Sequence, residues 1–221
     1  MKLLLLPGLD GTGELFATFI AAMAGVECRV VRYPVDRPMD YAARECLADR
    51  EPCVLLGESF SGPVAIALAA ENPPGLRGVV LCCSFASNPL PRLAPLRRVI
   101  GAAPAIKLPA RWFAPWLYAR HGTPELRRAH AQAMSRVSAA TLRARVAAVL
   151  AADYRECLRR ITVPMLYLQA SEDRLIPRSA LEDIRRIRRD VRVAKFDAPH
   201  FLLQTRAAEC AAAVRDFLKD L

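Results

Sequence analysis

Ser59 is the residue of this sequence whose surroundings best suit nucleophilic chemistry. It follows an apolar run and stands two residues after Gly57, in the segment Gly57-Glu58-Ser59-Phe60-Ser61-Gly62. A serine hydroxyl is a poor nucleophile by itself, so it needs an adjacent base that a third group orients. A sharp strand-to-helix turn with small neighbours would expose such a hydroxyl. The same segment also suits a serine that caps a helix, so by itself it leaves both interpretations open.

Two further residues stand where the partners of a nucleophilic serine are expected. Asp173 follows the apolar run 164–169, and His200 follows the run 191–196. The carboxyl ends of parallel strands meet at one edge of a sheet, so we predict that Ser59, Asp173 and His200 share that edge. The order serine, acid, histidine, with each residue after a strand, favours a catalytic triad over a helix cap.

Other ionisable residues are weaker candidates for this chemistry. His121 and His130 follow no strand, and we expect surface or structural roles for both. Glu58, beside the serine, is expected to be solvated or in a salt bridge. Three further acids are less suited to orient His200, because each is adjacent to a preferred residue or lies in helical sequence: Glu172, Asp197 and Asp153.

Acyl transfer to a serine also needs N–H donors for the developing oxyanion. Phe60, directly after the serine, is expected to supply one backbone amide. The glycine-rich loop 7–13 follows the first predicted strand and places Leu9 to supply the second. This loop lacks G-x-G-x-x-G, and no acid at the end of a second strand fits a ribose, so a dinucleotide site is not predicted.

Short apolar runs alternate with segments of helical period, which indicates an α/β protein with a mostly parallel sheet. About six strands are predicted, at 2–6, 28–33, 53–57, 78–83, 164–169 and 191–196. Helices are predicted at 13–23, 41–48, 59–71, 179–187 and 205–218. We expect one domain, residues 1–221, because a chain of this length suits a single large core.

The segment between Cys83 and Pro164 breaks this alternation. It holds proline-bounded helical pieces, 110–120 and 124–150, and is predicted to form a helical cap insertion at about 86–160. The alternative is that this insertion only packs against the rest of the domain and has no role in ligand binding. The insertion carries aromatic candidates for binding an apolar part of a substrate, namely Trp112, Phe113 and Trp116, with Tyr118 beside them. Arg111 and Arg120 are candidates for steering an anionic one.

Bulk composition excludes several classes of protein. The net charge of +10 comes mainly from scattered arginines without a nucleic-acid-binding module, so we expect a solvated basic surface and no nucleic-acid partner. The seven cysteines lack paired spacing, which predicts no metal site and favours a reducing, cytoplasmic location. No stretch is long and apolar enough to suggest a membrane span.

Four segments together resemble motifs of the α/β-hydrolase superfamily, in its small esterase and lipase-like branch: 7–13, 57–62, 171–177 and 199–201. The resemblance covers nearly the whole chain and implies a parallel sheet, here without the N-terminal hairpin, and no cofactor. It also implies that Ser59 is the nucleophile, His200 the general acid and base, and Asp173 its orienting group. Leu9 and Phe60 would then supply the oxyanion amides.

Two residues depart from the motifs of that superfamily. Pro7 stands where many members have histidine, and Ser61 replaces the usual last glycine of G-x-S-x-G. Ser61 is expected to crowd the turn against the strand. Neither departure removes a reacting group.

The leading interpretation is a hydrolase that cleaves a carboxylic ester or thioester of a small-molecule or carrier-linked acyl substrate through an acyl-enzyme. An acyltransferase or a carbon–carbon bond hydrolase would use the same triad. A non-catalytic ligand-binding member of the fold is the third alternative. The sequence predicts no particular oligomeric state.

Overall fold

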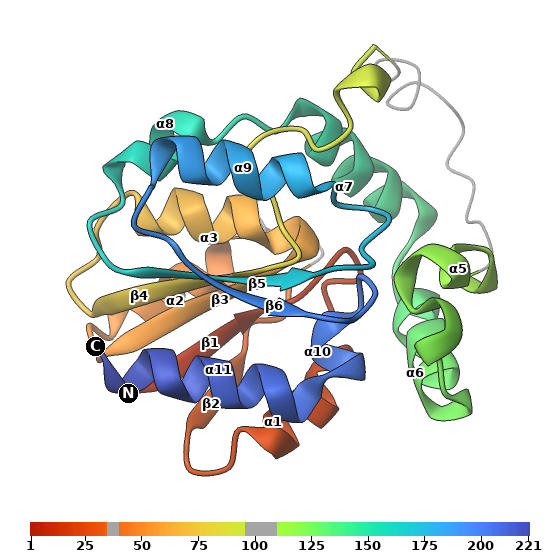
Figure 1. Ribbon diagram of the computed structural model, residues 1–221, viewed down its shortest axis with the longest axis horizontal. Helices are drawn as coiled ribbons and strands as arrows, with labels where there is room; N and C mark the ends of the chain where they lie inside the picture. Colours follow the sequence, from red (N-terminus) through yellow and green to blue (C-terminus); the bar gives the residue numbers. More distant parts are fainter. Residues whose placement is uncertain (35–39, 96–109) are drawn as a thin grey trace.

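The computed structural model describes residues 1–34, 40–95 and 110–221, which form a central sheet between two layers of helices (Figure 1). The sheet has six strands in the order β2-β1-β3-β4-β5-β6, and all five neighbouring pairs are parallel. The strands are β1 (Lys2–Leu6), β2 (Glu27–Val30), β3 (Cys53–Glu58), β4 (Leu76–Cys82), β5 (Met165–Ala170) and β6 (Arg192–Phe196). The predicted α/β class and strand number are confirmed.

The central strands read as continuous apolar runs because helices cover both faces of a parallel sheet. All six residues of β3 are buried, whereas the edge strands β2 and β6 have only half-buried and exposed positions. β2 ends at Val30, before the predicted end at Tyr33. Tyr33 instead turns toward the loop after β1, where its N–H donates to the Gly11 carbonyl at 3.0 Å.

Two hydrophobic cores lie on opposite faces of the sheet. One is packed by helices α2 (Tyr41–Ala48), α3 (Gly62–Ala69), α8 (Arg155–Arg160) and α9 (Arg178–Ile187). The other is packed by α1 (Ala17–Ala22), α10 (Leu202–Thr205) and α11 (Ala207–Lys219). Two predicted helices begin with a short helical turn of their own: η1 (Glu14–Phe16) before α1 and η2 (Ser59–Ser61) before α3. The predicted helix 205–218 corresponds to α11, and α10 ends where that prediction begins.

The described part of the predicted insertion consists of helices, the turns between them and an isolated bridge between Ser87 and Asp153. Its helices are η3 (Pro91–Leu93), η4 (Ala110–Phe113), α5 (Ala114–Leu117), η5 (Ala119–His121), α6 (Pro124–Ser135), α7 (Ala139–Ala151) and α8. Residues 96–109 of the prediction lie outside the described ranges. The predicted helix 124–150 is two helices, because the Ser138 side chain caps α7 by accepting from the Thr141 N–H at 3.0 Å.

The helices α5, α6 and α7 lie beyond the carboxyl ends of the strands, at the right of Figure 1. α8 instead packs against α3 and α9 in the layer over the sheet. The part of the insertion near the carboxyl edge therefore ends before α8. Both chain termini lie at the opposite edge of the sheet (Figure 1).

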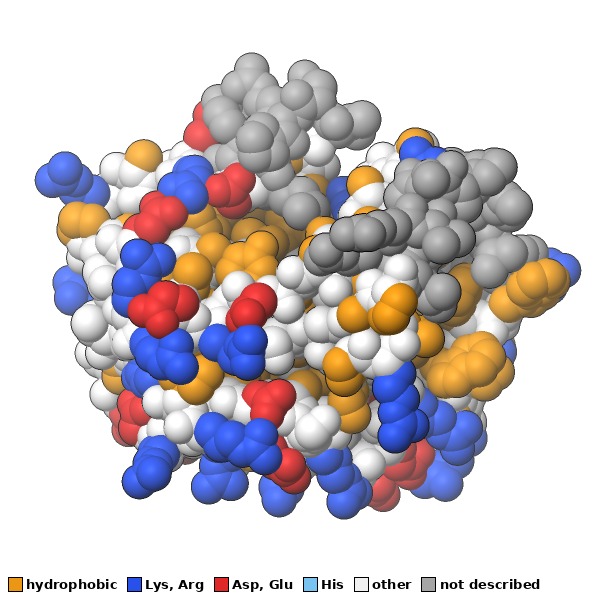
Figure 2. Space-filling model, turned by 90° about the horizontal axis from the view of Figure 1, so that it is seen from above, with side chains coloured by type: hydrophobic (Ala, Val, Ile, Leu, Met, Phe, Trp, Pro, Cys, Tyr) orange, Lys and Arg blue, Asp and Glu red, His pale blue; other side chains and the backbone are white. Residues whose placement is uncertain are grey.

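Acidic side chains accompany many of the basic ones at the surface. Arg44 pairs with Glu71 at 2.6 Å, and Arg155 pairs with Asp153 at 2.6 Å. Figure 2 shows the two charge types interspersed over the visible face. All seven cysteines are free. Within the described ranges, none of the helices has the length and apolar character required to span a bilayer.

Candidate active site

Ser59 stands in the sharp turn between β3 and α3. Its φ of 50° lies in the left-handed region, which is costly for a residue other than glycine and persists only when the surroundings hold it. Gly57 allows this turn, because a Cβ there would lie 2.7 Å from the Ser61 carbonyl oxygen. The turn thus aims the Ser59 hydroxyl at the carboxyl edge of the sheet.

The second glycine that the turn needs is Gly62, one residue later than in the usual motif. A Cβ at Gly62 would lie 1.8 Å from Ser84 Oγ, so only glycine fits without rearrangement. Ser84 follows the end of β4, and its hydroxyl donates to the Ser59 carbonyl at 2.6 Å. Tyr167 of β5 holds this segment in turn by donating to the Ser84 carbonyl at 2.7 Å.

Ser61 does not crowd the strand as expected. Its fully buried hydroxyl donates to the Pro7 carbonyl, and Tyr33 donates to it. The serine therefore ties the turn of Ser59 to the loop after β1 and to the segment after β2. A glycine at this position could make neither bond.

The structure brings the three candidate catalytic side chains together, as predicted from the sequence. His200 Nε2 lies 2.8 Å from Ser59 Oγ, and His200 Nδ1 lies 2.8 Å from Asp173 Oδ2. The other carboxylate oxygen of Asp173 accepts the backbone N–H groups of Leu175 and Ile176, at 2.8 and 2.9 Å. Asp173 is thus fixed on one side and free to orient the imidazole on the other.

His200 is buried, and its environment alters its basicity. Burial alone lowers the pKa of His200. The charge of Asp173 and its hydrogen bond, with a smaller contribution from Glu58, outweigh this effect and raise the pKa above 6.5. Such a histidine is a better proton acceptor than one in water, provided the pH keeps it neutral.

The three acids that the sequence disfavours as partners of His200 bind other side chains. Glu172 binds Arg120 at 2.7 Å, and Asp197 accepts from the Ser171 hydroxyl at 3.1 Å. Asp153 pairs with Arg155, whose hydrogen bonds lower the pKa of that carboxyl to about 2. Asp173 is therefore the acid that the structure joins to His200.

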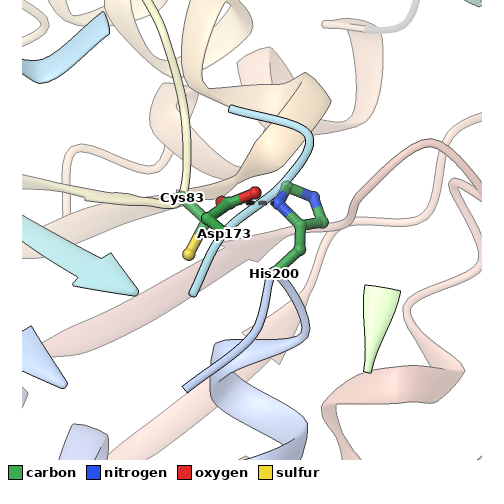
Figure 3. Close-up of side chains that lie close together, drawn as sticks. All are labelled: Cys83, Asp173 and His200. Atoms are coloured by element: carbon green, nitrogen blue, oxygen red, sulfur yellow. Dashed lines mark hydrogen bonds and ion pairs between the residues drawn. The ribbon is translucent and has the colours of Figure 1, made fainter. Parts of the chain in front are cut away.

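A thiol completes a cluster with the acid and the histidine (Figure 3). Potential ligand atoms of Cys83, Asp173 and His200 lie within 4.8 Å of one another. Thiolate, imidazole and carboxylate can bind Zn²⁺. However, Nδ1 of His200 already bonds to Asp173, and burial raises the pKa of the Cys83 thiol. The arrangement therefore favours a hydrogen-bonded acid–histidine pair over a metal site.

The two predicted oxyanion donors lie on neighbouring segments. Phe60 opens the turn after Ser59, and Leu9 lies in the loop that Ser61 holds through Pro7. Within the described ranges, neither backbone N–H has a hydrogen-bond acceptor in the protein. Both amides are thus available to a substrate.

Glu58 differs from the sequence-based expectation. It is buried, and its carboxylate accepts from Gln204 Nε2 at 2.8 Å and forms no salt bridge with the described residues. Burial raises the pKa of Glu58 to about 7, although the bond from Gln204 and the charge of His200 oppose the shift. The residue before the serine is therefore a second ionisable group near the histidine.

The predicted substrate-binding aromatics lie at the surface. Trp112, Phe113 and Trp116 are exposed at 55%, 38% and 46%. Tyr118 is buried, with its ring centroid 5.7 Å from that of Phe201, which follows the histidine. Substrate binding by Trp112, Phe113 and Trp116 stays a prediction.

A small apolar cavity of about 30 Å³ lies beside Phe60, under α7. Its lining includes Phe60, Val64, Phe85, Ala148, Val149 and Tyr154. Arg111 is exposed, and Arg120 is bound to Glu172. Arg145 of α7 instead lies at the loop after β1, where its Nη1 donates to the Leu9 carbonyl at 2.7 Å.

Sequence reasoning missed the residues that brace the site from elsewhere in the chain: Tyr33, Ser84, Arg145, Tyr167 and Gln204. Ser84 stands two residues after the end of β4, so its place at the carboxyl edge was a usable signal. The others act across long sequence separations that no local pattern marks.

Comparison with known proteins agrees with this geometry. The model of the alpha/beta hydrolase family matches residues 3–213. The chain therefore belongs to the alpha/beta hydrolase family and is a hydrolase. None of the curated proteins compared with the chain matches it.

Several solved structures share the fold. The enol-lactonase from Burkholderia xenovorans LB400 superposes with a TM-score of 0.83 at 20% identity, over 99% of this chain and 91% of that one. A malate-bound thermophilic esterase from Thermogutta terrifontis gives 0.81 at 20% identity, over 100% and 90%. A hydrolase from Pseudomonas aeruginosa PA01 gives 0.80 at 22% identity, over 98% and 89%. At these identities the similarity establishes the fold alone.

Proposed function

We propose that the protein hydrolyses a carboxylic ester or thioester through an acyl-enzyme on Ser59. The observation that carries this proposal is the continuous hydrogen-bonded chain from Ser59 through His200 to Asp173, with 2.8 Å at each step. Two of the structures that share the fold are named as an esterase and a lactonase, and both names denote attack on an acyl carbon.

In the first half of the reaction, His200 Nε2 takes the proton from Ser59 Oγ as that oxygen attacks the acyl carbon. The backbone N–H groups of Leu9 and Phe60 stabilise the oxyanion of the tetrahedral intermediate. His200 then gives the proton to the departing alkoxide or thiolate, which leaves the acyl group on Ser59. Asp173 keeps Nδ1 protonated and stabilises the imidazolium.

In the second half, water takes the place of the leaving group. His200 removes its proton as it attacks the acyl-enzyme and then returns that proton to Ser59 Oγ, which releases the acid. The same donors serve both halves, so the site needs no rearrangement between them.

Hydrolysis of a matched butyrate oxygen ester and thioester, 4-nitrophenyl butyrate and butyrylthiocholine, tests this proposal. We expect turnover of at least one by the parent protein and a loss of about a thousandfold or more in Ser59→Ala. Ser179→Ala, on the exposed surface of α9, is the matched control and should behave as the parent. Hydrolysis that survives Ser59→Ala unchanged would refute the proposal.

A further inference from the structure

Arg145 is a buried cation beside the oxyanion loop. It belongs to α7, is only 6% exposed, and gives one N–H to the Leu9 carbonyl at 2.7 Å. Its guanidinium carbon lies 5.5 Å from the centroid of the Tyr33 ring. A Cβ on Gly11 would come within 2.5 Å of Nη1, so the loop is shaped around this side chain.

The charge of Arg145 has no close counter-ion in the described parts of the chain. No carboxylate there lies within 4.0 Å of its guanidinium. The charge of Asp10 stabilises the charged guanidinium of Arg145 from a greater distance. One oxygen of Asp10 already accepts from the Thr12 N–H and hydroxyl. A guanidinium has five N–H donors, and the Leu9 carbonyl uses one. Burial of an incompletely paired cation is costly unless a partner arrives.

A second unpartnered polar atom lies under the insertion. His130 of α6 is 3% exposed, and its Nδ1 has no hydrogen-bond partner in the described structure. Its ring centroid is 5.3 Å from that of Phe201, the neighbour of the candidate catalytic histidine. Burial lowers the pKa of His130, and the charge of Asp10 opposes this shift. Both side chains therefore reach from the insertion toward the loop that carries Asp10.

The helix of Arg145 also lines the apolar cavity beside Phe60. Ala148 and Val149 follow Arg145 by three and four residues, and both line this cavity. Positions with that spacing share a helix face. One face of α7 thus carries Ala148 and Val149, which line the cavity, and Arg145 one helical turn before them.

We infer that the acyl part of the substrate carries a carboxylate that binds the guanidinium of Arg145. Its methylene chain would lie along the cavity beside Phe60, and its ester carbonyl would reach Ser59. This inference rests on the proposed function and names its substrate class. A carboxylate fits because it accepts two parallel N–H bonds from one guanidinium and brings one negative charge to one cation.

The test compares two esters of one length: the 4-nitrophenyl monoester of adipic acid and the 4-nitrophenyl ester of its monoamide. Rates are corrected for spontaneous hydrolysis. We expect the parent protein to prefer the anionic ester by about 10- to 100-fold in kcat/KM, the range for a charged hydrogen-bonded pair. Arg145→Gln should remove this preference, because its loss in kcat/KM should be about 10- to 100-fold larger for the anionic ester than for the neutral ester.

Arg128→Gln is the matched control, since it removes one exposed charge from α6 of the same insertion. It should keep the preference of the parent. Arg145→Lys retains the charge without the bidentate geometry, so it should keep a smaller preference, and it serves if Arg145→Gln does not fold. Free adipate should inhibit hydrolysis of the neutral ester by the parent more than adipamide does.

Equal kcat/KM for the two esters with the parent protein would overturn the inference. An equal loss on both esters in Arg145→Gln would also overturn it, because Arg145 would then only support the loop. In either case, hydrolysis of the neutral ester that disappears in Ser59→Ala leaves the proposed function standing. Hydrolysis that Ser59→Ala does not change would remove the proposed function itself.

Discussion

The buried polar side chains of the described structure gather around Ser59. They come from the last residue of β3, from the segments that follow β1, β3, β4 and β6, and from the insertion: Asp10, Glu58, Ser61, Ser84, His130, Arg145 and His200. Charges interact more strongly in such a low-dielectric setting than in water, and each unpaired one costs more. At the scale of single residues, the protonation states of Glu58 and His200 should therefore be coupled.

Glu58→Gln tests that coupling through the pH dependence of activity. The charge of Glu58 contributes to the raised pKa of His200, so its removal should make the imidazolium less stable. We expect the acid limb of kcat/KM for a neutral ester to have its midpoint above pH 6.5 in the parent and to move to lower pH in the variant. An unchanged midpoint, or one that moves to higher pH, would contradict this account.

The same substitution should change how stability depends on pH. The pKa of Glu58 is about 7 in the folded protein, against an ordinary value of 4.5. Below pH 4.5 the side chain is neutral in both states, whereas above pH 7 folding must bury a carboxylate. Glu58 should therefore lower the free energy of unfolding as the pH rises from 4.5 to 7, by up to about 3 kcal/mol.

Urea unfolding at pH 5 and pH 8 measures this difference. Relative to the parent, Glu58→Gln should be more stable at pH 8 than at pH 5, by about 1 to 3 kcal/mol. Glu182→Gln, exposed on α9, should show no such trend. A parallel shift of the variant at both pH values would show that Glu58 stays neutral, or stays charged, throughout this range.

At the scale of elements, the turn between β3 and α3 depends on contact with the segment after β4. Gly62→Ala should clash with the Ser84 side chain, lower the free energy of unfolding by about 1 to 3 kcal/mol and lower activity strongly. Adding Ser84→Gly removes the clashing atoms and should restore part of the stability, although the bond to the Ser59 carbonyl is lost. A double variant no more stable than Gly62→Ala would show that the strain lies elsewhere.

The elements also show which features the sequence could predict. Five of the six strands were predicted to within two residues at each end, because buried parallel strands read as short apolar runs. Ser59, Asp173 and His200 were found because each follows such a strand, which a linear reading can detect. The exception is β2, an edge strand with an alternating pattern. It ends before Tyr33, whose side chain bonds to Ser61 instead of continuing the strand.

Other features of the site depend on contacts that no local pattern records. Ser61 bonds across 54 positions to Pro7, and Arg145 bonds across 136 to Leu9. Glu58 is of an ionisable residue type, which favours an exposed position, yet the fold buries it. The break between α6 and α7 had a local signal, since Ser138 followed by Thr141 is a capping arrangement.

At the scale of the whole molecule, the insertion and the sheet differ in how much apolar surface holds them. The sheet lies between two large cores, whereas α5 and α6 rest on a small cluster of Leu15, Ala114, Leu117, Tyr118, Ala133 and Phe201. A segment with few buried apolar contacts opens at a lower free energy than the global transition. Opening of these helices would expose the site without unfolding the sheet.

Native-state hydrogen exchange followed by mass spectrometry tests this difference. Amides of α5 and α6 should exchange through openings that cost less than global unfolding, and those of β3 and β4 only through global unfolding. Tyr118→Ala should accelerate exchange in α6 much more than in β3, because Tyr118 packs on Phe201 and His130. Equal acceleration in both would mean that the insertion and the sheet open as one unit.

The most direct test of the central claim is covalent labelling of Ser59 with a fluorophosphonate. Such a probe reacts with a serine that an adjacent base activates. Intact mass and peptide mapping should show one adduct on Ser59 in the parent protein, none in Ser59→Ala and much slower labelling in His200→Gln, with Ser179→Ala labelled as the parent is. No adduct on the parent protein, or an equal adduct on Ser59→Ala, would contradict the account.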